Sequence, residues 1–243
     1  MDNIIGIDVS LNSTGFCYRT KDTIKYGCVH NLQHYTKKNE EYVDLYNRIS
    51  QTDLFVLLKE ADVHLEFFQR EPTPKVKSIG LSEWERIHLQ NSFTISNLIS
   101  NNINKVIQNQ NNILIFENYS HGAGDQLIQI VEFTSKLKYD LIFNSKLANI
   151  ENFHLIPGPT LKSFAHKRHN KKFSADKISM VEIWLSESDP SDKLKKVVLE
   201  NRHIFIKNIK KKNGSVIEAP VSPLDDLVDA YFLTEYLKDK YKK

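Results

Sequence analysis

Residues 4 to 8 read Ile-Ile-Gly-Ile-Asp, an apolar run that ends in a single carboxylate, Asp8. A short, continuous apolar run is typical of a strand that is buried on both faces, as in the centre of a sheet. A lone charge is costly to bury unless another group pairs with it. We therefore expect Asp8 to lie at the end of a central strand and to need a positively charged partner.

Other strands are predicted around this run. Apolar segments bounded by turn residues occur at 14–18, 24–29, 113–116 and 153–156. The first two follow closely on residues 4–7 and predict an antiparallel meander. The run at 113–116 also ends in an acid, Glu117. Because crossover connections are right-handed, this strand is expected beside the first one, with Asp8 and Glu117 at neighbouring strand ends.

Helices are predicted between and after these strands. Helical patterns cover about 42–58, 82–108, 125–146, 160–166, 174–186 and 223–241. Ser82 is expected to cap the second of these helices. Residues 204–221 predict a hairpin around Asn213-Gly214. The expected fold class is therefore α/β, with a five-stranded mixed sheet, an antiparallel β-meander plus parallel strands, flanked by helices.

Length and composition limit the possible classes of protein. The chain has 243 residues, of which 40% are hydrophobic, enough for one core and a single domain over 1–243. We find neither a signal peptide nor a run of membrane-spanning length, so we expect a cytoplasmic protein without membrane contact. The two cysteines, Cys17 and Cys28, make no disulfide framework and are expected to be small buried residues.

Positive charge is concentrated in one part of the chain. The formal net charge is only +3, but residues 161–212 contain 14 Lys and Arg against 6 Asp and Glu. A basic segment in an otherwise balanced protein suggests a face that meets a polyanion, although solvated helix faces would give the same composition.

The last predicted helix carries three acids, Asp225, Asp226 and Asp229. Residues three or four apart share one side of a helix. Acids near a helix start are often caps, but Asp229 lies beyond the first turn on an otherwise apolar stripe. We interpret Asp226 and Asp229 as site residues and Asp225 as a cap, with Asp225 as the alternative to Asp226.

Four carboxylates from two strand ends and one helix suit a hard cation. Carboxylate oxygens favour Mg²⁺ or Mn²⁺ over zinc. Two such ions about 4 Å apart are a common device for cleaving phosphodiesters. The pairs His30 and His34, and His166 and His169, have ligand-like spacing but no completing partners, so we interpret them as structural or surface histidines.

Five motifs occur in a characteristic order along the chain. They are Ile5-Gly6-Ile7-Asp8 leading to Thr14-Gly15, Ile115-Phe116-Glu117-Asn118-Tyr119-Ser120 with Leu137-Lys138-Tyr139 in the following helix, Pro159-Thr160-Leu161-Lys162-Ser163-Phe164-Ala165, Ala175-Asp176-Lys177, and Asp226-Leu227-Val228-Asp229-Ala230. Together they resemble the RuvC-type Holliday junction resolvases, particularly the divergent phage-borne members.

The resemblance implies an RNase H-like fold and a homodimeric endonuclease that cuts four-way DNA junctions with two Mg²⁺ or Mn²⁺ ions per site and no nucleotide cofactor. The family's metal-binding acids fall on Asp8, Glu117, Asp226 and Asp229. Lys177 matches a catalytic lysine near the scissile phosphate. Segments 33–83 and 187–222 are atypical insertions.

Basic residues near the third and fourth motifs are predicted to bind DNA. Lys162 matches a family lysine at a DNA-facing helix start, and the residues around it suggest a phosphate-tracking surface. The predicted DNA-binding residues are Lys162, Lys167, Arg168, Lys171, Lys172 and Tyr119. Where the family often has a junction wedge, this chain has Ser120 with Tyr119 before it, and Val9-Ser10-Leu11-Asn12 replaces the usual small turn after Asp8.

Several alternatives remain open at this point. The same acids would serve an RNase H-like nuclease that acts on other branched DNA or on RNA-DNA hybrids, or the chain could be a catalytically silent DNA-binding protein of this fold. The run from Gly6 to Gly15 also resembles the first phosphate loop of actin-like or sugar-kinase-like ATPases. The chain has 8 glycines and no second glycine-rich phosphate loop, which disfavours that class.

Overall fold

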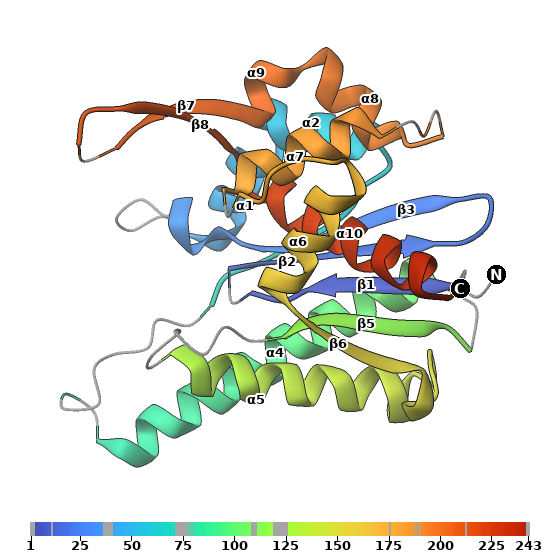
Figure 1. Cartoon of the computed structure of the whole chain (residues 1–243). Helices are drawn as coiled ribbons and strands as arrows, with labels where there is room; N and C mark the ends of the chain where they lie inside the picture. The colour runs from blue at the N-terminus through green and yellow to red at the C-terminus, as the bar shows by residue number, and fades with distance from the viewer. Residues whose placement is uncertain are drawn as a thin grey trace.

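A six-stranded mixed sheet forms the centre of the molecule (Figure 1). The computed structural model describes residues 3–10, 12–35, 41–70, 78, 80–107, 111–118, 126–174, 176–187, 189, 191–211 and 213–241. The strands, in the sheet order β4-β3-β2-β1-β5-β6, are β1 (Ile4–Asp8), β2 (Ser13–Arg19), β3 (Ile24–Asn31), β4 (His64–Phe68), β5 (Ile113–Asn118) and β6 (Phe153–Pro157).

The pairing of the strands confirms the mixed α/β class. The first three strands form the predicted antiparallel meander, and β5 and β6 follow in parallel on the other side of β1. A sixth strand, β4, pairs parallel to β3 at the sheet edge and was not predicted from the sequence. Its sequence His-Leu-Glu-Phe-Phe is short and only partly buried, so it carries no strong strand pattern.

Helices cover both faces of this sheet. They are α1 (Tyr42–Ser50), α2 (Asp53–Glu60), α4 (Leu81–Val106), α5 (Gln126–Tyr139), α6 (Gly158–Arg168), α7 (Lys177–Ser186), α8 (Lys193–Glu200), α9 (Arg202–Phe205) and α10 (Leu224–Tyr241). A separate hairpin, β7 (Ile206–Lys210) and β8 (Val216–Pro220), lies close to its predicted position. No helix of the described residues is both long and apolar enough to cross a membrane.

Three details of the helix prediction are wrong. The helix expected over 42–58 is broken in two at Gln51 and Thr52, where the Thr52 amide bonds back to the Ile49 carbonyl. Ser82 is not a cap, because α4 begins one residue earlier and Gly80 precedes it with φ +80°. The helices α8 and α9, which lie in the segment 187–222 that was expected to be an insertion, were not predicted from the sequence.

The alternation of side chains along the strands separates two cores. Ile5 and Ile7 of β1 pack with apolar residues of α4 and α5, whereas the opposite face of the sheet packs with α6, α7 and α10. Cys17 and Cys28 are free thiols and buried, as predicted. Both faces of β1 are therefore covered, which explains its continuous apolar sequence.

Two glycines allow α10 to lie directly on the sheet. A Cβ atom at Gly6 would come within 2.3 Å of the Ala230 carbonyl oxygen, and one at Gly15 within 2.6 Å of the Asp226 carbonyl oxygen. Any side chain at these positions would force the helix away from β1 and β2. The glycines thus determine how closely the acidic start of α10 approaches the end of β1.

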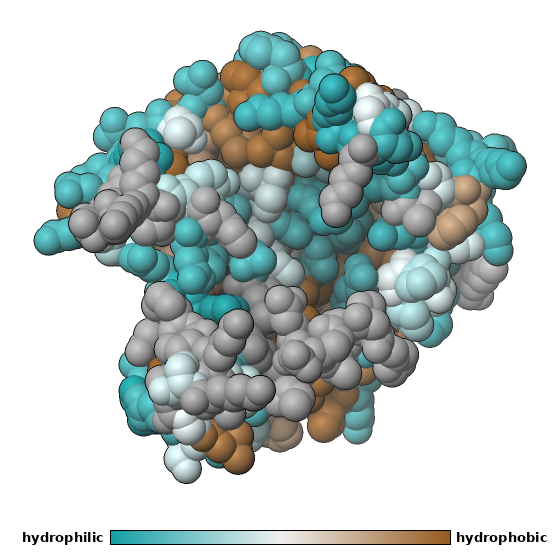
Figure 2. Space-filling view, turned by 90° about the vertical axis from the view of Figure 1, so that its left-hand side faces the viewer, coloured by the Kyte–Doolittle hydropathy of each residue, from teal (hydrophilic) through white to brown (hydrophobic). Residues whose placement is uncertain are grey.

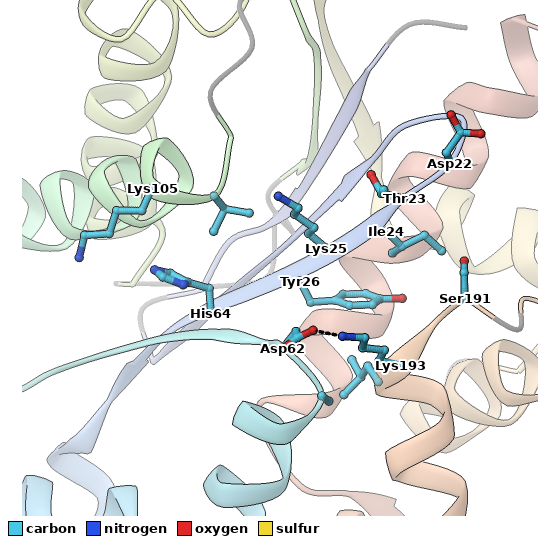
Figure 3. A pocket seen from close by; sticks show the side chains of 13 residues that line it. Asp22, Thr23, Ile24, Lys25, Tyr26, Asp62, His64, Lys105, Ser191 and Lys193 are labelled. Atoms are coloured by element: carbon cyan, nitrogen blue, oxygen red, sulfur yellow. Dashed lines mark hydrogen bonds and ion pairs between the residues drawn. The ribbon is translucent and has the colours of Figure 1, made fainter.

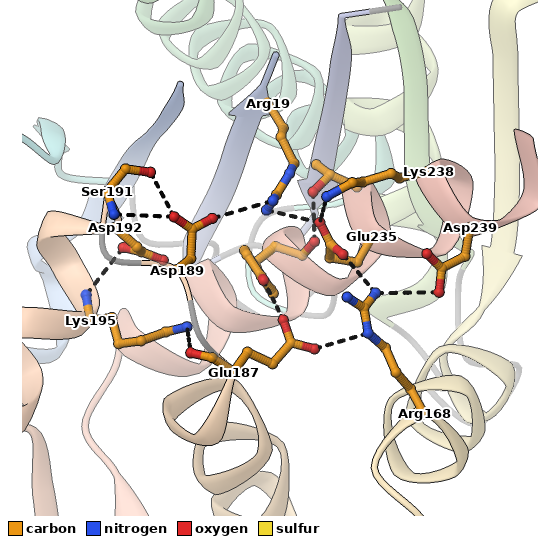
Figure 4. A network of polar contacts seen from close by, with 12 residues as sticks. Arg19, Arg168, Glu187, Asp189, Ser191, Asp192, Lys195, Glu235, Lys238 and Asp239 are labelled. Atoms are coloured by element: carbon orange, nitrogen blue, oxygen red, sulfur yellow. Dashed lines mark hydrogen bonds and ion pairs between the residues drawn. The ribbon is translucent and has the colours of Figure 1, made fainter. Parts of the chain in front are cut away.

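A buried ion-pair network holds the other end of α10 (Figure 4). Glu235, which is fully buried, lies 2.8 Å from Arg19 Nη1 of β2 and 2.6 Å from Arg168 Nη1 of α6. Arg168 also contacts Glu187 at 3.2 Å, and Tyr231 of α10 donates a hydrogen bond to the same Glu187 carboxylate. The network therefore ties α10 to β2, to α6 and to the segment after α7.

We expect Glu235→Gln to destabilise the fold by about 3 to 5 kcal/mol, because it leaves the largely buried Arg19 and the partly exposed Arg168 without their shared, buried carboxylate. Urea unfolding followed by circular dichroism measures this change. The control is Asp62→Asn, which removes an exposed ion pair with Lys193 and should cost less than about 1 kcal/mol. Equal effects of the two substitutions would contradict the central role of the network.

Candidate active site

β1 and β5 bring Asp8 and Glu117 together at one end of the sheet. Ile7 pairs with Phe116, so the next residues on the two strands occupy adjacent positions. Ile7 and Phe116 point into the core beneath α4 and α5, which directs the two carboxylates to the face covered by α10. Figure 2 views this end of the molecule and shows a hollow, largely hydrophilic area near its middle.

Glu117 lies against the start of α6. A Cβ atom at Gly158, the first residue of α6, would come within 2.3 Å of Glu117 Oε1. Glycine is therefore needed at this position if the carboxylate is to stay where it is. The N-terminal end of a helix also favours negative charge.

α10 brings the remaining predicted acids to the same place. Asp226 lies in its first turn, and Asp229 follows three residues later. Burial raises the pKa of Asp8 well above its usual range, and the charges of Glu117, Asp229, Asp226 and Asp225 raise it further. The structure thus brings the four predicted carboxylates close enough for their charges to interact strongly.

The pKa values of the other three acids are raised as well. Burial and the charge of Glu117 raise the pKa of Asp229 to about 7. Burial and then Asp225 raise the pKa of Asp226, while burial raises that of Glu117. Four carboxylates that resist ionisation together make a site that gains stability from an added cation.

Two lysines partly offset this negative charge. Lys177, at the start of α7, forms an ion pair with Asp225. Its pKa is raised because Asp225, Asp226 and Asp8 outweigh the opposing effect of its burial. Lys162 of α6 lowers the pKa values of Glu117 and Asp229. Lys162 was predicted from the sequence only as a DNA-binding residue, and its position near the acids was not predicted.

The structure distinguishes Asp225 from Asp226. Asp225 is not the expected cap, because it lies inside α10 as its second residue and pairs with Lys177. Its Oδ1 atom is buried and makes no hydrogen bond to the described residues. Asp226 accepts a hydrogen bond of 3.2 Å from Ser222 Oγ. Both carboxylates therefore stay available as candidate ligands.

The donor set fits a hard metal ion in its chemistry, since it consists of carboxylates and includes no cysteine. In the arrangement described here, no three His, Cys, Asp or Glu side chains of the described residues are placed so that they could hold a metal ion. Binding of a cation therefore requires the carboxylates to turn toward it. Their mutual repulsion favours that change once a positive charge is present.

A polar cavity of about 380 Å³ adjoins the acids. It is lined by Ser10, Asn12, Ser13, His30, Tyr35, Lys177, Ser222, Asp225 and Asp226. The three serines of this cavity were not predicted as site residues; the turn after β1 was the available signal for Ser10 and Ser13, and no such signal marked Ser222. A separate cavity of about 490 Å³, bordered by Lys25, Lys105 and Lys193, includes none of the acids of the site (Figure 3).

The histidines act as structural residues, as interpreted from the sequence. His30 is 4% exposed and its ring lies against Tyr35 and Phe55. His166 is buried between the Lys162 carbonyl and Ser179 Oγ, and His169 bonds to Glu187. The side chain of His34 lies outside the described residues.

Apart from Lys162, which faces the acids, the predicted DNA-binding residues fall into three groups. Lys167, Lys171 and Lys172 are exposed around the end of α6. Arg168 instead pairs with the carboxylates of the network in Figure 4, so its charge already has partners within the fold. Tyr119 and the neighbouring Ser120 lie outside the described residues.

Comparisons with known proteins give little direct information. No protein-family model matches the chain, and no curated protein matches it. A solved structure with a related arrangement is that of the yeast mitochondrial Holliday junction resolvase Ydc2, with 16% sequence identity and a TM-score of 0.43. The match covers 96% of this chain and 75% of the resolvase. A likeness this distant carries no conclusion about the present chain.

The raised pKa values predict how stability depends on pH without metal. A carboxyl group whose pKa is higher in the folded state binds its proton more tightly there, so stability falls as pH rises above about 4. For Asp229 this fall ends above its folded pKa of about 7. We expect Asp229→Asn in EDTA to be more stable than wild type at pH 8, by up to about 4 kcal/mol, and to flatten the decline.

Thermal unfolding between pH 5 and pH 8 measures this effect. Asp22→Asn, in an exposed turn, is the matched control and should follow the wild-type curve. A melting temperature of Asp229→Asn at or below that of wild type at pH 8 would show that the carboxylate is not under electrostatic strain.

Proposed function

We propose that the chain is a metal-dependent, structure-selective DNA endonuclease with an RNase H-like fold, which cleaves four-way junctions. The observation that carries the proposal is the meeting of Asp8, Glu117, Asp226 and Asp229 beside two lysines, with each acid raised in pKa by burial or by the others. The order of the meander and of the two parallel strands supports the same fold.

The four carboxylates would hold Mg²⁺ or Mn²⁺ in this proposal. When bound, such ions activate a water molecule and stabilise the leaving oxygen of the phosphodiester. Asp226 is buried, and Asp8 and Asp229 are partly buried, so water screens their attraction for cations less than it would at an exposed site. The chain's own contribution is therefore an acidic recess held in place by packing, within which the carboxylates can turn toward the ions.

The lysines would act on the phosphate. Lys177 Nζ and Lys162 Nζ supply positive charge near the acids, where phosphate oxygens gain negative charge during cleavage. Lys177 is paired with Asp225 in the absence of substrate, and a bound phosphate would compete with that carboxylate. The ion pair thus keeps the lysine oriented toward the recess before DNA arrives.

The proposed substrate is branched DNA, bound by a homodimer. The exposed residues Lys167, Lys171 and Lys172 would contact phosphates outside the recess. The acids themselves act only on the phosphodiester group, which all these substrates share. Selectivity among junctions, forks and hybrids therefore depends on the outer contacts and on the dimer.

Cleavage assays with defined substrates test the proposal. We expect purified protein with Mg²⁺ or Mn²⁺ to make paired, symmetric nicks in a labelled four-way junction, and EDTA to abolish them. Asp229→Asn should lower the rate by more than about a hundredfold, since even residues that only support metal ligands have effects of that size. Asp226→Asn and Asp225→Asn, compared side by side, identify which of the two is a ligand.

The control for these variants is Asp22→Asn, which leaves the recess intact and should cut like wild type. Cleavage of forks or RNA-DNA hybrids at the same rate as junctions would widen the substrate class. Junction binding with no cleavage of any substrate would favour a catalytically silent DNA-binding protein.

Lys177→Gln separates catalysis from binding. We expect it to lower the junction cleavage rate by on the order of a hundredfold, because it removes a charge that acts on the transition state. Junction affinity in EDTA should change little, and Lys177→Arg should restore part of the rate. Lys193→Gln, an exposed lysine outside the recess, is the control. Equal losses of affinity and rate would instead assign Lys177 to simple DNA binding.

A further inference from the structure

The hairpin β7–β8 is a structure apart from the main sheet. Its two strands pair only with each other within the part of the chain that the structure describes. Its base is held by the buried Ile206, by a hydrogen bond from the Val221 amide to the Phe205 carbonyl, and by Arg202, which contacts Glu218 at 3.0 Å. An uncovered two-stranded hairpin is only marginally stable in water, so this one needs its anchored base.

The hairpin extends toward the same side of the molecule at which β1 and β5 end (Figure 1). A hollow of about 770 Å³ between its base and α7 is bordered by Lys177 of the recess and by Lys211 of the hairpin. Glu182 and Glu218 also border this hollow, and both contact Arg202. One continuous surface therefore leads from the candidate catalytic lysine to the hairpin.

Among the described residues of the hairpin, the charged side chains that form no ion pair are all lysines. Lys207, Lys210 and Lys211 are exposed, and none of them forms an ion pair with a described acid. Its acid Glu218 is already engaged by Arg202. The outer part of the hairpin thus presents cations without internal partners, as expected of a surface that binds a polyanion.

The lysines lie on both faces of the ribbon. Lys207 pairs across the hairpin with Ala219 and Lys210 with Val216, so these two lysines, three residues apart, point to opposite faces. Lys211 lies just beyond β7, where its amide donates a hydrogen bond of 2.8 Å to the Ser215 carbonyl. Charge on both faces suits a ribbon that enters a groove between two phosphate backbones rather than one that lies on a flat surface.

We propose that this hairpin binds a duplex DNA arm that leads away from the recess, by entering a groove of the duplex. A two-stranded ribbon fits the major groove, which is about 12 Å wide. A five-residue strand is about 17 Å long and spans about five base pairs at 3.4 Å each.

Lysines act as point charges on phosphates, so the contact is independent of sequence. The inference rests on the proposed nuclease function, because it assigns that site's substrate a second contact.

Binding measurements in EDTA test the inference without requiring catalysis. We compare wild type, the triple variant Lys207→Gln, Lys210→Gln and Lys211→Gln, and a control with the same loss of charge, Lys21→Gln, Lys25→Gln and Lys59→Gln. The control lysines are exposed and lie on the β2–β3 turn, in β3 and in α2. Fluorescence anisotropy with a labelled 20-base-pair duplex and a four-way junction gives affinities over a range of salt concentrations.

We expect the hairpin variant to bind both DNAs at least about tenfold more weakly at 0.1 M salt. Its slope of log affinity against log salt should be shallower by about 2 to 3, one counterion or slightly less for each lost phosphate contact. The triple Lys→Arg variant should keep the wild-type slope. All variants should melt like wild type, because the substituted side chains are exposed.

Two results would overturn the inference. One is a hairpin variant that binds DNA as tightly as wild type does, which would indicate that the hairpin binds another partner, such as a protein. The other is a control variant that loses as much affinity as the hairpin variant, which would show an effect of net charge alone. A protein that cuts no DNA, but loses affinity only in the hairpin variant, would contradict the nuclease proposal and keep this one.

Discussion

The contact of the α10 backbone with Gly6 of β1 and Gly15 of β2 is the constraint on which the candidate site depends. Without side chains at these positions, a helix that starts with acids can lie at backbone distance from the strand that ends in Asp8. At the far end, Glu235 joins the helix to Arg19 and Arg168. Because both ends are held, α10 cannot move away to relieve repulsion among the carboxylates. Packing contacts therefore hold the site together although its carboxylates repel one another.

That repulsion explains the positions of the lysines. A group of buried acids with raised pKa values costs folding free energy, and proteins commonly accept such costs at functional sites. Lys162 and Lys177 come from α6 and α7, two elements that pack beside α10, and each faces part of the group. They reduce the cost without filling the recess. A phosphate between the lysines and the acids would meet positive charge on one side and, with cations bound, on the other.

Most of the site could be predicted from sequence because its geometry follows from local rules. Neighbouring parallel strands end on the same side of the sheet, which places Asp8 beside Glu117. Helical spacing puts Asp226 and Asp229 on one side of a helix. Properties that depend on distant contacts could not be predicted. Arg168 and Lys167 look alike in sequence and both reach the surface, yet Arg168 pairs with three carboxylates of other elements while Lys167 forms no ion pair with a described acid. The edge strand β4 was missed for a related reason, since half-buried positions leave a weak pattern.

The segment 187–222 connects the recess to the outer surface. Glu187 at its start contacts Arg168 and Tyr231, and Ser222 at its end donates to Asp226. Between them lie α8, α9 and the β7–β8 hairpin. The segment 187–222 therefore contacts α10 at two places, Asp226 and Tyr231, and also contains the hairpin. In the proposed complex, the segment that binds the DNA arm is thus also one that helps to position the helix with Asp226 and Asp229.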